Sequence, residues 1–185
     1  ADIGGRRAAA HATFDQNLEE AKRLAGLFAA IADFPKPVVG RVHGNVLGGG
    51  MGLTCACDIV VASDDARFGL TEVRLGILPA IIVPYEVAKI GESAARELFL
   101  PGERFEAVRA LEIGLVRAAV PEADLDAAVE GRVQELMKAG PRAVAEAKAL
   151  IREVAFRRVE DVQRYTVERI AEMRDEFEIP MLPAE

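Results

Sequence analysis

The sequence has no tryptophan, and aromatic residues make up only 5% of its 185 positions. Proteins that bind single-stranded nucleic acid stack bases on aromatic side chains, so this scarcity argues against such a ligand. The formal net charge is −7, whereas contact with a phosphate backbone requires basic surfaces. Nucleic acid is therefore not an expected partner.

Cysteine is also scarce, with Cys55 and Cys57 as the two members of one C-x-C pair. No second cysteine pair and no histidine cluster accompanies them, as a structural metal site would require. The sequence has no run of about 20 apolar residues, the length that a helix needs to cross a bilayer. We therefore expect a globular chain with no metal and no membrane partner, in a reducing, cytoplasmic compartment.

The hydrophobic pattern predicts an α/β part followed by a helical part. Leu18, Ala21, Ala25 and Phe28 share one stripe of an amphipathic helix over residues 14–34. Short runs rich in β-branched or small apolar residues predict strands, and longer periodic runs predict helices. The further expected strands are 38–42, 59–62 and 118–120, and the expected helices include 50–56, 93–100, 125–139, 141–154 and 159–178.

A glycine turn at residues 48–50 opens the predicted short helix. Glycines leave the backbone N–H groups open to a ligand, and a helix start offers unpaired donors at the positive end of its dipole. Such a turn can stabilise negative charge that develops on an oxygen atom. The alternative is that these glycines serve only close packing between a strand and a helix.

Glu72 is the main candidate for chemistry beside this turn. Its neighbours Phe68, Leu70, Val73 and Leu75 predict an apolar setting, in which a carboxyl group can both accept and donate a proton. The alternative is a surface glutamate paired with Arg67 or Arg74.

Other reaction classes lack support in the sequence. Ser63 and Ser93 lie outside any G-x-S-x-G motif, and His43 has no evident catalytic partner. The glycine run lacks the GK[ST] of a phosphate-binding loop and the glycine spacing of a dinucleotide site. Serine hydrolysis, phosphoryl transfer and hydride transfer are therefore not expected.

The segment KPVVGRVHGNVLGGGMGLTCACDIVVASDDARFGLTEVRLGILP, residues 36–79, closely resembles the signature region of the enoyl-CoA hydratase/isomerase (crotonase) family. The shared pattern is an apolar strand, HG, LGGG, a helix ending in CD, and FG-x-x-E-x-x-LG-x-x-P. The opening ADIGG is similar to the G-A-D-I loop of the family, and a weaker likeness continues to about Val120.

The resemblance implies an α/β fold, with a spiral of ββα units over residues 1–120 and a helical trimerisation region over residues 121–185. The family's first strands have no counterpart here, so we expect that this chain begins partway through a longer polypeptide. The implied partners are acyl-CoA thioesters of fatty acid and lipid metabolism, and copies of the chain in a homotrimer or dimer of trimers. Coenzyme A is then part of the substrate, and no cofactor is implied.

By position, the resemblance also implies roles for individual residues. The backbone N–H groups of Ala1 and Gly49 would form an oxyanion hole for the thioester carbonyl, and Glu72 would transfer the proton. Residues of the first loop and of two later turns would contact the substrate. These substrate-binding residues are Ala1, Asp2, Ile3, Gly49, Gly50 and Ala80.

Two departures from the family pattern leave the reaction open. Hydratases typically carry two glutamates, and Gly52 stands where the first is expected; the loop at residues 79–85 is also bulkier and more apolar than usual. With its single glutamate, the sequence resembles hydratases of the methylglutaconyl-CoA type. The favoured function is therefore hydration of a 2-enoyl-CoA thioester, with branched acyl groups included. The alternatives are a Δ3–Δ2-enoyl-CoA isomerase with Glu72 as sole proton shuttle, and a non-catalytic acyl-CoA-binding protein.

Overall fold

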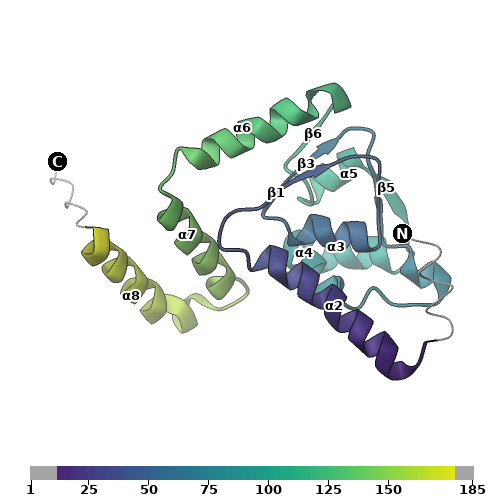
Figure 1. Cartoon of the computed structure of the whole chain (residues 1–185), viewed down its shortest axis with the longest axis horizontal. Coiled ribbons are helices and arrows are strands. Elements are labelled where there is room, and N and C mark those ends of the chain that lie inside the picture. The colour runs from purple at the N-terminus through teal and green to yellow at the C-terminus, as the bar shows by residue number, and fades with distance from the viewer. Residues whose placement is uncertain (1–11, 178–185) are drawn as a thin grey trace. The chain divides into compact units, whose positions relative to one another are not determined.

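The computed structural model describes residues 12–177, which belong to two compact units that divide between Ala139 and Gly140 (Figure 1). The first unit is mixed α/β and the second is a pair of helices. The elements of the first unit are α2 (Phe14–Ala32), β1 (Val39–Val42), β2 (Asn45–Leu47), α3 (Gly49–Ala56), β3 (Ile59–Ser63), β4 (Arg67–Gly69), the 3₁₀ turn η1 (Glu72–Leu75), α4 (Val83–Phe99), β5 (Arg104–Glu106), α5 (Ala107–Glu112), β6 (Ala118–Val120), the 3₁₀ turn η2 (Glu122–Asp124) and α6 (Leu125–Met137).

Two three-stranded sheets organise the first unit. One has the order β1-β3-β6 with all strands parallel, and the other has the order β2-β4-β5, in which β2 and β4 are parallel and β5 is antiparallel. The segments β1-β2-α3 and β3-β4-α4 therefore each place their first strand in one sheet and their second strand in the other, followed by a helix. This is the ββα spiral that the resemblance to the crotonase family implied.

The spiral brings corresponding parts of successive turns side by side. Leu47 at the end of β2 is in register with Gly69 at the end of β4. The residues that follow these two strands consequently leave the sheet at the same place. Gly48 follows the first strand directly, and Glu72 lies three residues after the second.

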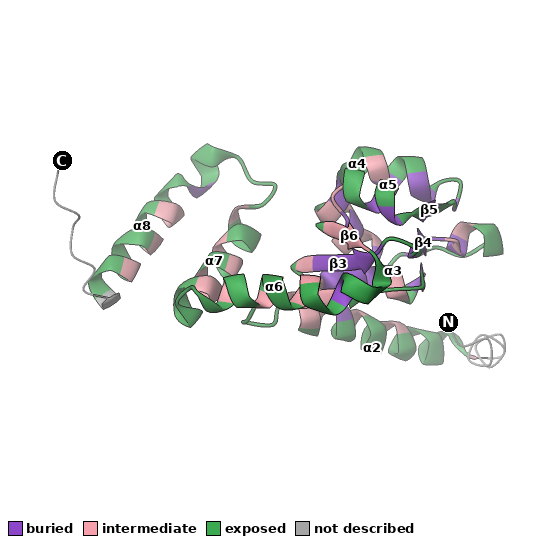
Figure 2. Cartoon of the chain, turned by 90° about the horizontal axis from the view of Figure 1, so that it is seen from above, coloured by how far each residue is buried: buried purple, intermediate pink, exposed green. Residues whose placement is uncertain are grey.

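Helix α2 confirms the first prediction from periodicity. A capping box at Thr13 and Gln16 starts it, and it ends three residues before Pro35. Phe28 is fully buried, while most of the helix is exposed. Figure 2 shows this contrast between α2 and the buried strand β3.

Two further helices pack against the core of the first unit. Helix α4 contacts α3, and it bends at Gly91, whose φ of 78° is not helical. Helix α6 packs against β1 and β3. The predicted helix from Leu125 is confirmed.

The second unit consists of α7 (Pro141–Val154) and α8 (Val159–Phe177). An ion pair between Glu146 and Arg169 joins the two helices. Of the helices within residues 12–177, none combines the length and the apolar composition that crossing a bilayer requires.

Candidate active site

Glu72 and Gly48 lie next to each other where β2 and β4 end. A Cβ atom added to Gly48 would lie 2.7 Å from Glu72 Oε1. Gly48 has a φ of 53°, which favours glycine, and its N–H donates to the Gly69 carbonyl at 3.2 Å. The glycine is therefore required both by its backbone conformation and by the carboxylate that lies against it.

The first turn of α3 presents unused donors next to this carboxylate. Within residues 12–177, the N–H groups of Gly49 and Gly50 donate to no protein acceptor, as expected at the start of a helix. Gly49 is exposed, and no atom lies within 4 Å of a Cβ placed on it. The Gly49 backbone is therefore exposed, and its N–H has no acceptor among the described residues.

The two arginines suggested as alternative partners of Glu72 bind elsewhere. Arg67 pairs with Glu106 at 3.3 Å, and Arg74 Nε donates to the Pro101 carbonyl at 3.0 Å. Glu72 is only 8% exposed, in agreement with the apolar setting predicted from its neighbours. Its position is therefore that of a buried carboxylate facing the glycine turn.

The side of α3 at Gly52 has no room for a second carboxylate. A Cβ at Gly52 would lie 2.7 Å from Phe28 Cζ and 3.2 Å from Ile82 Cγ1. The Phe28 ring is fully buried and packs on the Tyr85 ring in a T-shaped arrangement, with ring centres 6.0 Å apart. An aromatic ring of α2 thus fills the space that a side chain at position 52 would enter.

A second buried carboxyl group comes instead from α4. Glu86 is 0% exposed and lies on one helical stripe with Ile82 and Ile90, which are also buried. Burial, followed by the negative charge of Glu72, raises the pKa of Glu86 from 4.5 to about 8. Glu86 is thus a second buried carboxyl group, on α4, whose pKa responds to the charge of Glu72.

The sequence itself contains a signal for the burial of Glu86. Residues 82, 86 and 90 recur at intervals of four, so they share one face of a helix. An acidic residue between two isoleucines on such a face predicts a buried carboxyl group. The pattern does not reveal that the charge of Glu72 acts on this group, because that depends on how α4 packs.

The remaining predicted site residues are not all described by the structure. Ala1, Asp2 and Ile3 lie outside the described residues. Ala80 is exposed in the turn before α4, and within the described chain its N–H donates to no protein acceptor. The positions of Gly49, Gly50 and Ala80 are compatible with contact to a ligand, which stays a prediction.

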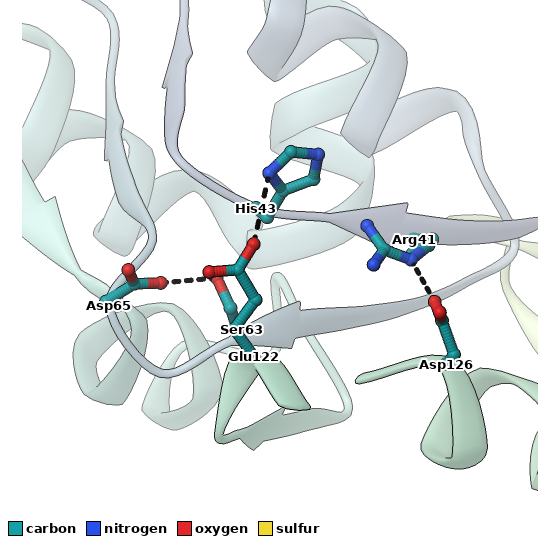
Figure 3. Close-up of polar contacts among 6 residues, drawn as sticks. All are labelled: Arg41, His43, Ser63, Asp65, Glu122 and Asp126. Carbon is teal, nitrogen blue, oxygen red and sulfur yellow. Dashed lines mark hydrogen bonds and ion pairs between the residues drawn. The ribbon is translucent and has the colours of Figure 1, made fainter. Parts of the chain in front are cut away.

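A second polar cluster lies where β1, β3 and β6 end (Figure 3). Ser63 is fully buried and donates to Asp65 Oδ1 at 2.6 Å, while His43 Nδ1 lies 3.9 Å from Glu122 Oε1. Figure 3 shows that the serine hydroxyl is engaged by the aspartate rather than by the histidine. The cluster therefore lacks the base-to-nucleophile hydrogen bond of a serine hydrolase.

Comparison with known proteins agrees with the family resemblance of residues 36–79. A sequence profile of the enoyl-CoA hydratase/isomerase family matches residues 2–176. A crystal structure of an enoyl-CoA hydratase from Shewanella pealeana is 37% identical with a TM-score of 0.88, covering 94% of this chain and 65% of that one. The Vibrio cholerae fatty acid oxidation complex subunit alpha is 40% identical over 117 residues, which are 60% of this chain and 16% of that protein.

The chain spans about half the length of the curated relatives it matches. A Thermus thermophilus relative, for example, is 34% identical over 137 residues, which cover 74% of this chain and 54% of that protein.

Proposed function

The chain belongs to the enoyl-CoA hydratase/isomerase family and has its crotonase fold, and from this premise we propose that the protein adds water to a 2-enoyl-CoA thioester. One observation carries the proposal. The buried carboxylate of Glu72 lies against Gly48, directly beside the unused N–H groups of the α3 turn. A proton acceptor and an oxyanion donor are thus adjacent.

In this proposal, the Gly49 N–H holds the thioester oxygen as negative charge develops there. Glu72 accepts a proton from water while the water oxygen bonds to C3, and the electrons of the C2–C3 double bond move toward the thioester oxygen. Glu72 then returns the proton to C2, which completes addition of H and OH across the double bond. The second donor of the hole is assigned to Ala1.

A single specific observation favours isomerisation as the second candidate. The Phe28 ring occupies the space beside Gly52, so no residue at that position helps to hold water. One carboxylate is sufficient to remove a proton from C2 of a 3-enoyl thioester and return it to C4. In that case the enolate is held by the same Gly49 donor.

We also propose that the protein assembles as a homotrimer or a dimer of trimers. The helices of the second unit expose large apolar side chains, including Ile151 at 66% and Val167 at 60%. Exposed apolar surface of this kind is typical of a protein–protein contact. Acyl-CoA thioesters of fatty acid metabolism are the proposed substrate class.

The reaction class is tested by supplying the whole protein with 2-enoyl-CoA and 3-enoyl-CoA of equal chain length. Formation of a 3-hydroxyacyl-CoA from the 2-enoyl substrate is the expected result. Reaction of the 3-enoyl substrate alone would replace hydration with isomerisation. Tight acyl-CoA binding without turnover of either substrate would identify a non-catalytic binding protein.

A further inference from the structure

The stretch of chain that carries Glu72 packs against a segment distant in sequence, residues 101–104, which leads from α4 into β5. Strands β4 and β5 are antiparallel, so Gly69 at the end of β4 lies opposite Arg104. A Cβ atom at Gly69 would lie 3.0 Å from the Glu103 carbonyl oxygen. The chain on the N-terminal side of Glu72 is therefore in close contact with this segment.

The same segment contacts η1 immediately on the C-terminal side of Glu72. Arg74 Nε donates to the Pro101 carbonyl at 3.0 Å. A Cβ atom at Gly102 would lie 2.8 Å from Val73 Cγ2 and 3.1 Å from Arg74 Cγ. Glu72 therefore lies between two points at which the chain is held by one and the same segment.

Hydrogen bonds within η1 define the shape of this turn. The Gly76 N–H donates to the Val73 carbonyl at 3.1 Å, and the Ile77 N–H donates to the Glu72 carbonyl at 3.2 Å. Bonds inside one turn fix its shape but do not fix its position relative to the strands beside it. The contacts with residues 101–104 supply that position, because they join η1 to β5 and, through β4, to β2.

We propose that Arg74 is a positioning residue for Glu72: its hydrogen bond to Pro101 holds η1 so that the carboxylate stays against Gly48. This inference rests on the proposed function, because it assigns the proton transfer to Glu72. Arg74 is exposed, so it is not required to fill the core. A charged donor makes a stronger hydrogen bond to a carbonyl than a neutral donor does, which suits a single tether.

Loss of the donor should lower kcat and leave KM nearly unchanged. Misplacing a catalytic group by about 1 Å costs about 10²-fold in rate, and the contacts of Gly102 remain, so we expect Arg74→Met to lose about tenfold in kcat. Arg74→Lys keeps a cationic donor on a long side chain and should recover most of this loss. KM should change little, because the Gly49 N–H that would bind the thioester oxygen belongs to α3 and not to η1.

Arg96→Met is the matched control, because it removes an exposed arginine of α4 that pairs with Glu92. Its kcat should equal that of the wild type. Adding Arg74→Met to Glu72→Gln should lower kcat no further than Glu72→Gln alone, since the group to be positioned is already absent. A wild-type kcat in Arg74→Met, or a further tenfold loss in the double variant, would overturn the proposal.

A second measurement does not depend on activity. Hydrogen exchange of the whole protein, followed by mass spectrometry, reports the opening of η1 through the N–H groups of Gly76 and Ile77. Exchange over residues 70–78 should be about tenfold faster in Arg74→Met than in the wild type, and close to wild type in Arg74→Lys. Unchanged exchange in Arg74→Met would refute the tether. Faster exchange in Arg74→Met, together with wild-type turnover by Glu72→Gln, would instead refute the proposed function alone.

Discussion

A Cβ atom at Gly48 and the Oε1 atom of Glu72 cannot both occupy their positions, because they would lie 2.7 Å apart. The Gly48 position belongs to the end of β2, and Glu72 belongs to the turn after β4. Pairing of these two parallel strands therefore determines where the carboxylate points. The glycine run and the glutamate form one structural unit rather than two separate motifs.

Gly48→Ala should displace the Glu72 carboxylate and reduce kcat by about 10²-fold, the effect of misplacing a catalytic group by roughly 1 Å. Gly44→Ala is the matched control. Gly44 also has a left-handed φ, of 66°, but no atom lies within 4 Å of its Cβ position. The Gly44→Ala variant therefore introduces backbone strain of the same kind but no steric clash with a neighbouring side chain. Equal losses in the two variants would show that strain, not displacement of Glu72, is responsible.

Gly52→Ala should destabilise the fold by about 1–3 kcal/mol, because the added methyl group meets the Phe28 ring. Replacing the ring with the shorter side chain of Phe28→Leu should recover part of this loss. The interaction free energy between positions 28 and 52 should be about 0.5–3 kcal/mol in a double-mutant cycle. Urea unfolding of the four proteins gives the coupling. Gly26→Ala, in open space on the exposed face of α2, should instead stabilise by about 0.5–1 kcal/mol. Additive effects at Gly52 and Phe28 would contradict the contact.

The buried Glu86 should make stability depend on pH. The pKa of Glu86 is raised in the folded state. Its contribution to the free energy of unfolding is therefore complete below its ordinary pKa of 4.5, and this contribution is lost as the pH rises toward about 8. Between these values, the free energy of unfolding should fall by up to about 1.4 kcal/mol per pH unit from this group. Urea unfolding at pH 5, 6, 7 and 8 measures the slope. Glu86→Gln should flatten it, and an unchanged slope in that variant would contradict the assignment.

The fold was largely predictable from the sequence where periodicity extends over many residues. The long helices and the strands β1, β3 and β6 were predicted, since their apolar residues repeat at helical or strand spacing. The strands β2, β4 and β5 were missed because each has three residues of which one or two are polar or glycine, whereas the equally short β6 is entirely apolar. They form through pairing between distant segments, which no local window contains.

The site was predictable to a similar degree. The apolar neighbours of Glu72 predicted its burial, and the glycine run predicted the free donors at the start of α3. The role of Phe28 in filling the space at Gly52 was not predicted, because it depends on how α2 packs on α3. For the same reason, the influence of Glu72 on the pKa of Glu86 was not predicted.

Assembly through the second unit can be tested by light scattering. The whole wild-type protein should have the mass of three or six copies, and Val167→Asp should reduce it by placing a charge in an apolar contact. Gln163→Asp, at an exposed position of the same helix, is the control and should leave the mass unchanged. A monomeric wild type, or an unchanged mass in Val167→Asp, would argue against a contact at this position.

The central role of Glu72 is tested most directly by the steady-state kinetics of Glu72→Gln with a 2-enoyl-CoA. Glutamine preserves the size of the side chain but cannot accept or return a proton. General acid–base catalysis contributes about 10²–10⁴-fold, so kcat should fall by that factor while the dissociation constant of the acyl-CoA changes little. Turnover by Glu72→Gln at the wild-type rate would contradict the assignment of proton transfer to this buried carboxylate.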